Sequence, residues 1–463
     1  MNDATSVRVP AGYQFRVSAQ ASLEGAPNAI LDPPRDARLT GSGPAAFAGP
    51  VRGVRGRLPV TATLTDATSG PTPWGSYLAG EEGFHRWFDV RDLDWRPTET
   101  ELRYGLGPRL PGGARSGAQP RLDLGADPSE ADRYGWVVEL DINPDGTPCA
   151  PVKRTALGRF NPVGATAVEC EGRVVVYSGD HENGGYLYKF VGADTWRRER
   201  ARGRSPLDNG VLHVAQFAAD GSGHWLPLVH GHGLLTVENG WRDQADVLLR
   251  TRLAADALGA TPLGRPQQVA VDPRGESAYC AIAGGTRTTR CQPTSEAGQA
   301  GPDRELDAPP WGHVLRWREN AGDATATAFR WDVTAWLGDS AGAAAMGAGD
   351  VGFFGRPRGL SVDPDGRLWI RTALVGTEHD LPEPVYRAFG NDAVLAADPM
   401  TGEVRRFLTV PRGREITAVV LAPDRRSLYV SVRWSATDSR RHAARPDPVT
   451  YAVRRRGGGV IGS

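Results

Sequence analysis

Histidine and cysteine are the side chains best suited to bind a metal ion or act as a nucleophile. His230 and His232 stand at alternate positions of an extended run, a spacing that suits a metal pair, but no third ligand follows nearby in the sequence. The chain also has four cysteines, at Cys149, Cys170, Cys280 and Cys291. Their spacing matches no zinc site, and four are too few for a disulfide scaffold in 463 residues. We therefore expect free thiols and favour no metal at the histidine pair.

Sequence patterns of common catalytic centres give no further candidate. The chain has no Gly-x-Ser-x-Gly elbow, no phosphate-binding loop and no dinucleotide-binding fingerprint. Lys and Arg number 54, as do Asp and Glu, so the formal net charge is zero. This balance argues against a nucleic-acid binder that neutralises phosphates and against a polybasic membrane anchor. We expect neither nucleic acid nor a membrane among the partners, and the sequence is silent on the oligomeric state.

The first residues indicate the compartment, and the amino-acid composition indicates the origin of the protein. Residues 1–6 contain neither a basic region nor an apolar stretch, and no run of about 18 apolar residues occurs anywhere. We therefore expect a cytoplasmic protein. Only two of the 54 basic residues are Lys. Heavy use of Arg, Ala, Gly and Pro is typical of GC-rich codons, which indicates a GC-rich bacterial origin.

The elements that must position any site are indicated by a recurring turn. A β-type run, then Asp-Pro-x-Gly or a close variant, then another β-type run repeats along the chain. Pro fixes φ, Asp caps the turn and Gly accepts a positive φ, so each copy predicts a β-hairpin. We favour turn capping for these Asp residues, with metal binding as the alternative. The copies lie at residues 143–146, 272–275, 363–366, 398–402 and 422–424, with a relative at 217–223.

Hairpins spread over a long chain are typical of a β-propeller. The 58 Gly and 36 Pro residues supply many turns, while 40% hydrophobic residues supply a core. We therefore predict an all-β fold with one β-propeller domain over residues 1–463. Three stretches rich in Gly, Pro, Arg, Ala and Ser interrupt the pattern and are predicted to be surface insertions, and the end is predicted to be a loose tail. The insertions are residues 99–135, 192–210 and 285–310, and the tail is residues 454–463.

Several segments together resemble the PhoX-type alkaline phosphatases. One is residues 72–82, TPWGSYLAGEE, and another is residues 151–160, PVKRTALGRF. The others lie in family order at residues 177–191, 254–262, 265–266, 312–317 and 402–407. The resemblance implies a six-bladed propeller. It also implies an exported phosphomonoesterase with a ferric pair, calcium ions and a cysteine thiolate on iron.

The sequence departs from that family at its metal-binding motifs. Gly80 stands where the family has the cysteine before Glu-Glu, and Pro162-Val163 stands for a His-Glu pair. Gln267-Gln268 stands for Glu-Asp, and Arg358 stands for an Asp. The family's late Gln-His-Pro-Gly is replaced from Arg433 onward.

These replacements remove the ligands that hard cations require. Ferric iron and calcium need anionic oxygen ligands, and a fixed guanidinium about 4 Å away costs several kcal/mol. We therefore predict that the iron pair is absent and that no cofactor is needed. Calcium at Glu82 and Asp180 remains an open alternative.

The charged and amide side chains left near the former metal site are the candidate functional residues. His181 is the group that titrates near neutral pH, and we assign general acid/base roles to Glu81, His181 and Glu182. The predicted substrate-binding residues are Arg265, Gln267, Gln268, Arg358, Glu415 and Arg433. Structural alternatives stay open for three of these: a loop histidine at His181, a carboxylate bonded to backbone at Glu81, and a strut between blades at Arg265.

Three functions compete on this reading. The favoured one is a metal-independent enzyme that acts by general acid/base chemistry on a small anionic or amide-bearing molecule, with a role in specialised metabolite biosynthesis. The second is a metal-dependent phosphomonoesterase with altered ligands. The third is a non-catalytic propeller that binds a small molecule or a protein, since a fold does not fix a function.

Overall fold

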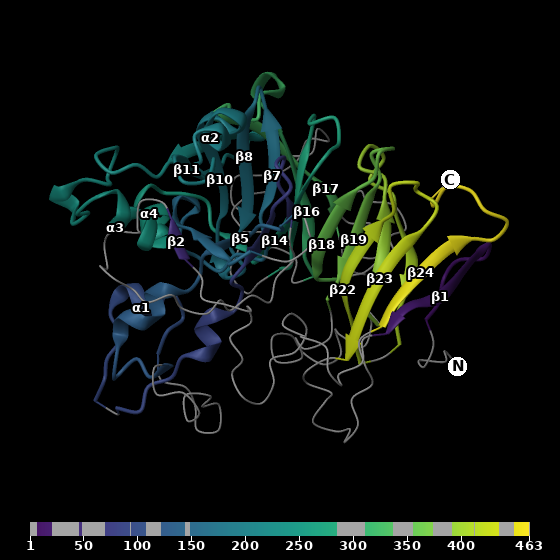
Figure 1. Ribbon diagram of the computed structural model, residues 1–463, viewed down its shortest axis with the longest axis horizontal. Helices are drawn as coiled ribbons and strands as arrows, with labels where there is room; N and C mark the ends of the chain where they lie inside the picture. The colour runs from purple at the N-terminus through teal and green to yellow at the C-terminus, as the bar shows by residue number, and fades with distance from the viewer. Residues whose placement is uncertain are drawn as a thin grey trace.

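The structure is a computed structural model of the chain. It describes residues 7–20, 46–48, 70–92, 94–107, 122–143, 149–284, 311–336, 355–373, 391–411, 413–434 and 449–462. Within these ranges the fold is almost entirely antiparallel sheet, arranged as successive units that lie side by side (Figure 1).

The N-terminal half forms two such units, which we call the first and second blades. The first blade has five strands in the order β2-β6-β5-β4-β3, and the second has the order β7-β8-β10-β11-β12. Strand β12 also pairs with the last strand of the third blade, so the second and third blades share one nine-stranded sheet. The strands of the first blade are β2 (Ala46–Ala48), β3 (Gly70–Pro71), β4 (Tyr77–Gly80), β5 (Val137–Leu140) and β6 (Val152–Arg154). Those of the second are β7 (Thr166–Cys170), β8 (Arg173–Gly179), β10 (Leu187–Thr195), β11 (Gly210–Phe217) and β12 (Ser222–Pro227).

The C-terminal half forms three more blades. The third blade has strands β14 (Pro266–Val271), β15 (Ala278–Ile282), β16 (His313–Glu319) and β17 (Ala328–Trp336). The fourth has β18 (Pro357–Val362), β19 (Leu368–Thr372), β20 (Ala393–Ala397) and β21 (Val404–Thr409). The fifth has β22 (Arg414–Leu421), β23 (Leu428–Trp434), β24 (Val449–Arg455) and β1 (Tyr13–Gln20), and a separate short pair joins β9 (Asn183–Gly185) to β13 (Leu263–Gly264).

This architecture confirms the predicted all-β propeller class. The blades are meanders in which consecutive strands pair, and β14, β18 and β22 each begin a blade and pack in sequence against one another. The described strands make up five blades, so the number six remains an expectation from the resemblance.

The predicted hairpin turns are confirmed where the structure describes them. Gly275, Gly366 and Gly402 all have positive φ, at 74°, 87° and 74°. At the first of these turns, the Asp272 carboxylate accepts the Arg274 N–H at 2.7 Å. Asp363 and Asp398 accept backbone N–H groups in the same way at the other two. These Asp side chains therefore cap turns, which is the favoured alternative.

Aromatic side chains fill the space between blades. Trp136, Trp225, Trp317 and Trp369 are almost completely buried. Tyr177 of β8 lies edge-on to Trp317 of β16, with ring centroids 5.4 Å apart. Packing between blades of this kind fixes the positions of the strand ends that carry the candidate site.

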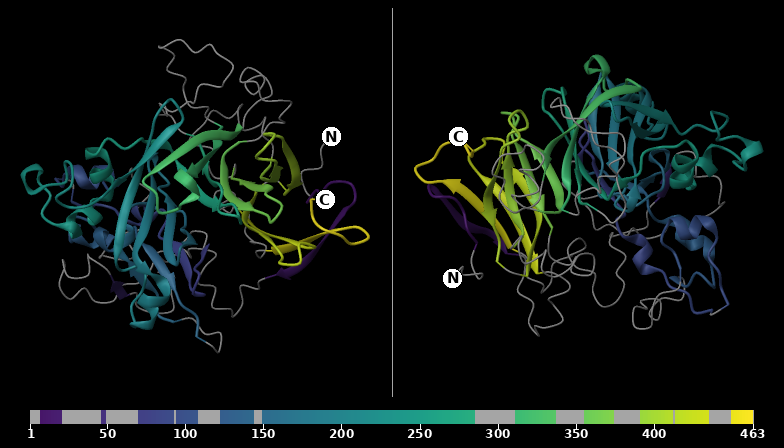
Figure 2. Two further views of the ribbon diagram at one scale, coloured as in Figure 1. Left: turned by 90° about the horizontal axis from the view of Figure 1, so that it is seen from above. Right: turned by 180° about the vertical axis from the view of Figure 1, so that it is seen from behind.

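The end of the chain is held in the fold rather than loose. Arg454 and Arg455 belong to β24 and pair with β1. Ile461 is buried, and its N–H donates to the Arg425 carbonyl at 2.8 Å. The predicted tail at residues 454–463 is therefore wrong over its described part, because the N-terminal strand completes the last blade with the C-terminal one (Figure 2).

Two of the three predicted insertions contain packed structure. Residues 99–135 include α1 (Glu99–Arg103) and a 3-10 helix at Pro128–Arg133. Their apolar residues form a buried cluster with the 3-10 helix Phe84–Trp87. Residues 192–210 include α2 (Trp196–Ala201), which buries Glu199. Residues 285–310 lie outside the described residues.

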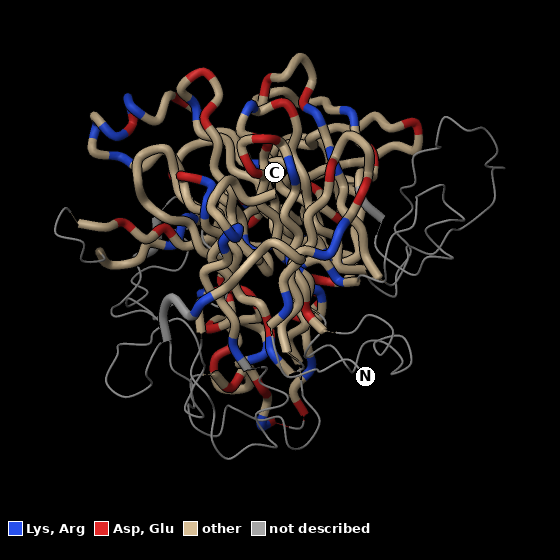
Figure 3. Tube along the Cα trace, turned by 90° about the vertical axis from the view of Figure 1, so that its right-hand side faces the viewer, with Lys and Arg blue, Asp and Glu red and all other residues tan. Residues whose placement is uncertain are grey.

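Two further helices follow the second blade, and the charged residues are spread over the described chain. Helices α3 (Gln244–Leu249) and α4 (Thr251–Ala257) follow the second blade. No described helix has the length and apolar character needed to cross a bilayer. Basic and acidic residues alternate along the described chain in Figure 3, in line with the zero net charge.

Candidate functional site

Strand β4 ends at Gly80, and the next residue is a structural carboxylate. Glu81 is fully buried and forms an ion pair with the buried Lys153, with Oε1 and Nζ 2.8 Å apart. Its other oxygen accepts the N–H groups of Gly135 and Trp136, each at 3.1 Å. Both oxygens are therefore engaged away from any substrate. The catalytic role predicted for Glu81 is a poor fit, and the structural alternative holds.

Glu82 faces a different set of partners. Its carboxylate accepts two hydrogen bonds from Nη2 of Arg358, at 2.8 and 2.9 Å. One of the same oxygens lies 2.5 Å from Nδ1 of His181. Burial raises the pKa of Glu82, but the charges of Arg358 and His181 outweigh burial and hold that pKa well below its usual value. Glu82 is thus an ionised carboxylate at neutral pH.

His181 is oriented by this carboxylate. Its backbone N–H donates to the Asn161 carbonyl at 2.9 Å, and its ring is mostly buried. Burial lowers the pKa of His181, and Glu82 opposes that effect. With Glu82 ionised, Nδ1 carries the proton that is shared with the carboxylate, which leaves Nε2 to act as a base. The structure thus gives His181 a carboxylate partner at Nδ1, and its acid/base role stays a prediction.

Asp180, next to His181 in the chain, is a structural residue. It is fully buried and forms an ion pair with the buried Arg252, whose Nε lies 2.7 Å from Oδ2. The other oxygen accepts the Asn161 N–H at 3.0 Å. Sequence reasoning did not find Arg252, because it lies in α4 and reaches Asp180 only through the fold.

Glu182 keeps a partly exposed carboxylate. It accepts a hydrogen bond from Nδ2 of Asn161 at 3.0 Å, and Nδ1 of His85 lies 3.6 Å away. The side chain is 31% exposed, so solvent and small molecules reach it. Asn161 thus forms hydrogen bonds with each of the three residues Asp180, His181 and Glu182.

The three candidates at the start of β14 lie on the neighbouring blade. Arg265 has a φ of 60°, a left-handed conformation that is unusual for arginine. Gln267 is buried and donates from Nε2 to the Arg265 carbonyl at 3.2 Å. Gln268 accepts the Leu360 N–H at 3.4 Å, which links β14 to β18. The Gln268 amide therefore joins two strands, whereas the Gln267 amide bonds within its own segment.

Glu415 and Arg433 form an ion pair on the fifth blade. Nε of Arg433 lies 3.1 Å from Oε2 of Glu415. Burial raises the pKa of Glu415, whereas Arg433, Arg358 and Arg371 lower it, and the result lies below the usual value. The charge of Arg358 thus acts on both Glu82 and Glu415. The structure joins Glu82, His181 and Arg358 directly, and it links Glu415 and Arg433 to them electrostatically.

The residues at the positions that resemble the family's metal-binding motifs do not fit a ferric pair. A Cβ atom on Gly80 would stand 2.1 Å from the Pro162 carbonyl oxygen, so a cysteine cannot occupy that position without a shift of backbone. Arg358 occupies the oxygens of Glu82, and Arg252 occupies those of Asp180. Among the described residues, no three His, Cys, Asp or Glu side chains are grouped to hold a metal ion. The same engaged oxygens speak against calcium at Glu82 and Asp180.

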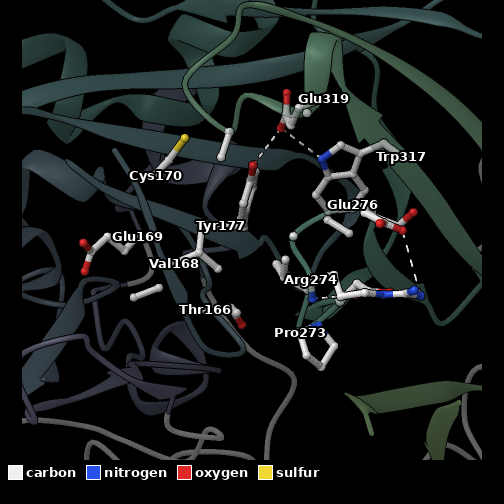
Figure 4. Close-up of a pocket in the computed structure, with 18 of the residues that line it drawn as sticks. Thr166, Val168, Glu169, Cys170, Tyr177, Pro273, Arg274, Glu276, Trp317 and Glu319 are labelled. Atoms are coloured by element: carbon white, nitrogen blue, oxygen red, sulfur yellow. Dashed lines mark hydrogen bonds and ion pairs between the residues drawn. The ribbon is translucent and has the colours of Figure 1, made fainter. Parts of the chain in front are cut away.

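A separate pocket lies between the second and third blades. Its volume is about 540 Å³, and Thr166, Tyr177, Arg274 and Glu319 are among its lining residues (Figure 4). None of the predicted site residues lines it. Its buried carboxylate, Glu319, already accepts hydrogen bonds from Tyr177 and Lys189.

The comparisons with known proteins agree on one relationship. The family model of alkaline phosphatase PhoX matches residues 5–435. The structure of Pseudomonas fluorescens PhoX in complex with vanadate, a transition state analogue, is similar with a TM-score of 0.78 and 32% identity, over 93% of this chain and 77% of that chain. The periplasmic gluconolactonase PpgL of Pseudomonas aeruginosa aligns with a TM-score of only 0.30 and 11% identity, over 83% of each chain. No curated protein matches the sequence.

Proposed function

The chain belongs to the alkaline phosphatase PhoX family, and on that premise we propose that it is a metal-independent enzyme that uses His181 as a general base. The substrate is a small anionic or amide-bearing molecule. The observation that carries the proposal is the arrangement around Glu82, whose carboxylate binds a guanidinium and an imidazole instead of a metal ion.

The proposed chemistry is a proton transfer at Nε2 of His181. Glu82 holds the ring through Nδ1 and stabilises the imidazolium that forms when Nε2 takes a proton. Arg358 keeps Glu82 ionised, so Glu82 positions the base and does not itself accept the proton. Glu182 follows His181 in the chain and has a partly exposed carboxyl group, so it is the proposed second proton carrier.

Binding of the substrate is assigned to the residues on the third to fifth blades. Arg265, Gln267 and Gln268 offer a cation and two amides from β14 and the residue before it, and Arg433 offers a cation from β23. The amide oxygen Oε1 of Gln267 is buried and has no hydrogen-bond partner among the described residues. A substrate N–H or O–H group would satisfy it.

The test is turnover in a metal-free buffer. Purified protein is assayed in EDTA against chromogenic p-nitrophenyl monoesters and p-nitroanilides of small dicarboxylic acids, which keep one free carboxylate. We expect turnover of at least one of them that H181Q abolishes and that added iron and calcium do not increase. Equal turnover by wild type and H181Q would exclude His181 as the base.

A phosphomonoesterase is the second candidate, because the matched structure is a PhoX that binds vanadate. Its test is hydrolysis of p-nitrophenyl phosphate with and without iron and calcium. Activity that appears only with the metals and is inhibited by vanadate would replace the first proposal. No turnover in either assay would favour a non-catalytic binding protein. A cytoplasmic location and a part in specialised metabolism belong to the first proposal, and cell fractionation tests the location.

A further inference from the structure

Arg371 on β19 is a buried cation that the proposed mechanism does not use. It is 6% exposed, and Nη1 donates to the Ile416 carbonyl at 2.6 Å. Among the described residues, no carboxylate lies within ion-pair distance of its guanidinium. Burying a charge without a counter-ion is costly, so such residues are rare unless something else supplies the opposite charge.

The fold keeps room for this guanidinium. A Cβ atom on Gly359 would stand 2.6 Å from Nε of Arg371 and 3.1 Å from Nη2. Gly359 does not have a positive φ, so the glycine serves the close approach and not a special backbone conformation. The side-chain oxygen of Gln268 lies 3.2 Å from the same point. The absence of a side chain at position 359 therefore lets Arg371 and Gln268 converge.

The charged groups around Arg371 are already paired with one another. Arg358 binds Glu82, and Arg433 binds Glu415. Asp392 acts on Arg371 only from beyond ion-pair distance. Burial and the neighbouring Arg358 lower the pKa of Arg371 to about 10, so it stays charged at neutral pH. Within the described part of the chain, the Arg371 guanidinium is thus left without a contacting counter-ion.

We propose that Arg371 binds the carboxylate of a monoanionic small molecule, and that this carboxylate belongs to the substrate of the proposed enzyme. A guanidinium presents a planar fork that matches a carboxylate. A single uncompensated cation balances one negative charge, which favours a monoanion over a phosphate dianion. The side chains of Arg358 and Arg433 are each 24% exposed, so the cluster is open to solvent.

The test compares three aromatic probes of similar size: benzoate, neutral benzamide and phenyl phosphate. Thermal unfolding is followed against probe concentration for wild type, R371Q and R274Q. Arg274 is 67% exposed and serves as the matched control. We expect a saturable rise in Tm with benzoate but not with benzamide, and at least about tenfold weaker benzoate binding in R371Q. R274Q should bind benzoate as wild type does.

Stability without any probe separates a binding role from a structural one. R371Q removes an uncompensated buried charge, so its Tm without ligand should equal or exceed that of wild type. A lower Tm would assign Arg371 a structural role and overturn the inference. So would unchanged benzoate binding in R371Q, no benzoate binding by wild type, or a stronger Arg371-dependent response to phenyl phosphate.

The inference rests on the proposed function, but the experiments distinguish its failure from a failure of the proposed function. Benzoate binding is measured without turnover, and H181Q should retain it. If H181Q binds benzoate and every ester and anilide goes unhydrolysed, the carboxylate site stands and the enzyme proposal fails. If turnover occurs but R371Q binds benzoate normally, the enzyme proposal stands and the carboxylate site at Arg371 fails.

Discussion

Two adjacent glutamates have different partners because the chain leaves strand β4 at Gly80 and turns at Glu82. Glu81 turns into the first blade toward Lys153, and Glu82 turns toward His181 and Arg358. Nothing in the sequence distinguishes them, since their partners lie far away along the chain. The sequence could predict a carboxylate pair at this place, but only the fold assigns one to support and one to the site.

The structural role of Glu81 predicts a loss of stability. In E81Q the buried ammonium of Lys153 loses its counter-ion, so we expect the free energy of unfolding to fall by about 3–5 kcal/mol. The measurement is denaturant unfolding, with E276Q as the control because Glu276 is 65% exposed. The control should stay within about 0.5 kcal/mol of wild type. Similar unfolding of E81Q and E276Q would contradict the assignment.

The family-like segment 72–82 also has a structural explanation. Trp74 Nε1 and Ser76 Oγ both donate to the carboxylate of Glu139, at 2.8 and 2.5 Å, and Arg154 binds its other oxygen. Burial raises the pKa of Glu139, but Arg154 and these hydrogen bonds lower it below its usual value. The resemblance in this segment therefore reflects, in part, a buried network of the first blade.

This network predicts a pH dependence of stability. A carboxyl group with a depressed folded-state pKa stabilises the fold above its unfolded pKa, and that contribution is lost as the pH falls toward the folded pKa. The difference in unfolding free energy between wild type and E139Q should therefore be largest near pH 7 and shrink below about pH 4.5. R154Q should reduce the pH dependence over the same range. A difference that stays constant from about pH 7 to about pH 3 would contradict this explanation.

At the scale of elements, the end of β4 lies directly against the segment that precedes β7. The Pro162 carbonyl fills the space that a side chain at Gly80 would need. In this structure the packing of the first two blades therefore leaves no room for a side chain at position 80.

A cysteine introduced at position 80 should destabilise the fold and should not create an iron site. In G80C the new side chain overlaps backbone, so we expect destabilisation of about 1–3 kcal/mol or more and no gain of iron. G107C is the matched control, because nothing lies within 4 Å of a Cβ atom at Gly107. Thermal unfolding and iron analysis of both variants make the comparison. Iron uptake by a stable G80C would show that the site can still form.

Elements that are determined by local residues could be predicted from the sequence, and elements that depend on distant packing could not. Hairpin turns are set by local residues, so Asp272 and Gly275 could be placed correctly. Residues 99–135 were predicted to be a surface insertion, yet Tyr104 and Leu122 are buried there. Composition alone misleads in such a segment, because a few apolar residues are enough to form a cluster against a neighbouring helix.

At the scale of the whole molecule, one strand from each end of the chain completes the fifth blade. Strand β1 pairs with β24 from Tyr13 to Gln20. Such pairing between distant parts of the chain leaves no local sequence signal, which is why the tail was predicted to be loose. The fold class was predictable because the same hairpin pattern repeats, whereas a blade completed by both ends of the chain occurs once among the described blades.

Deletion of residues 1–20 should therefore destabilise the protein. It leaves β24 as an exposed edge and removes the antiparallel pairing with β1. We expect a lower Tm and faster amide hydrogen exchange in β23 and β24. Deletion of residues 1–6 alone keeps β1 and should leave both unchanged. Equal behaviour of the two deletions would contradict the role of β1 in closure.

The central proposal is that the ion pair between Glu82 and Arg358 takes the place of a metal site. The most direct test is elemental analysis of protein produced with added iron and calcium and then dialysed against a weak chelator. We predict no stoichiometric iron in the wild-type protein. Two iron atoms retained per chain would contradict the claim.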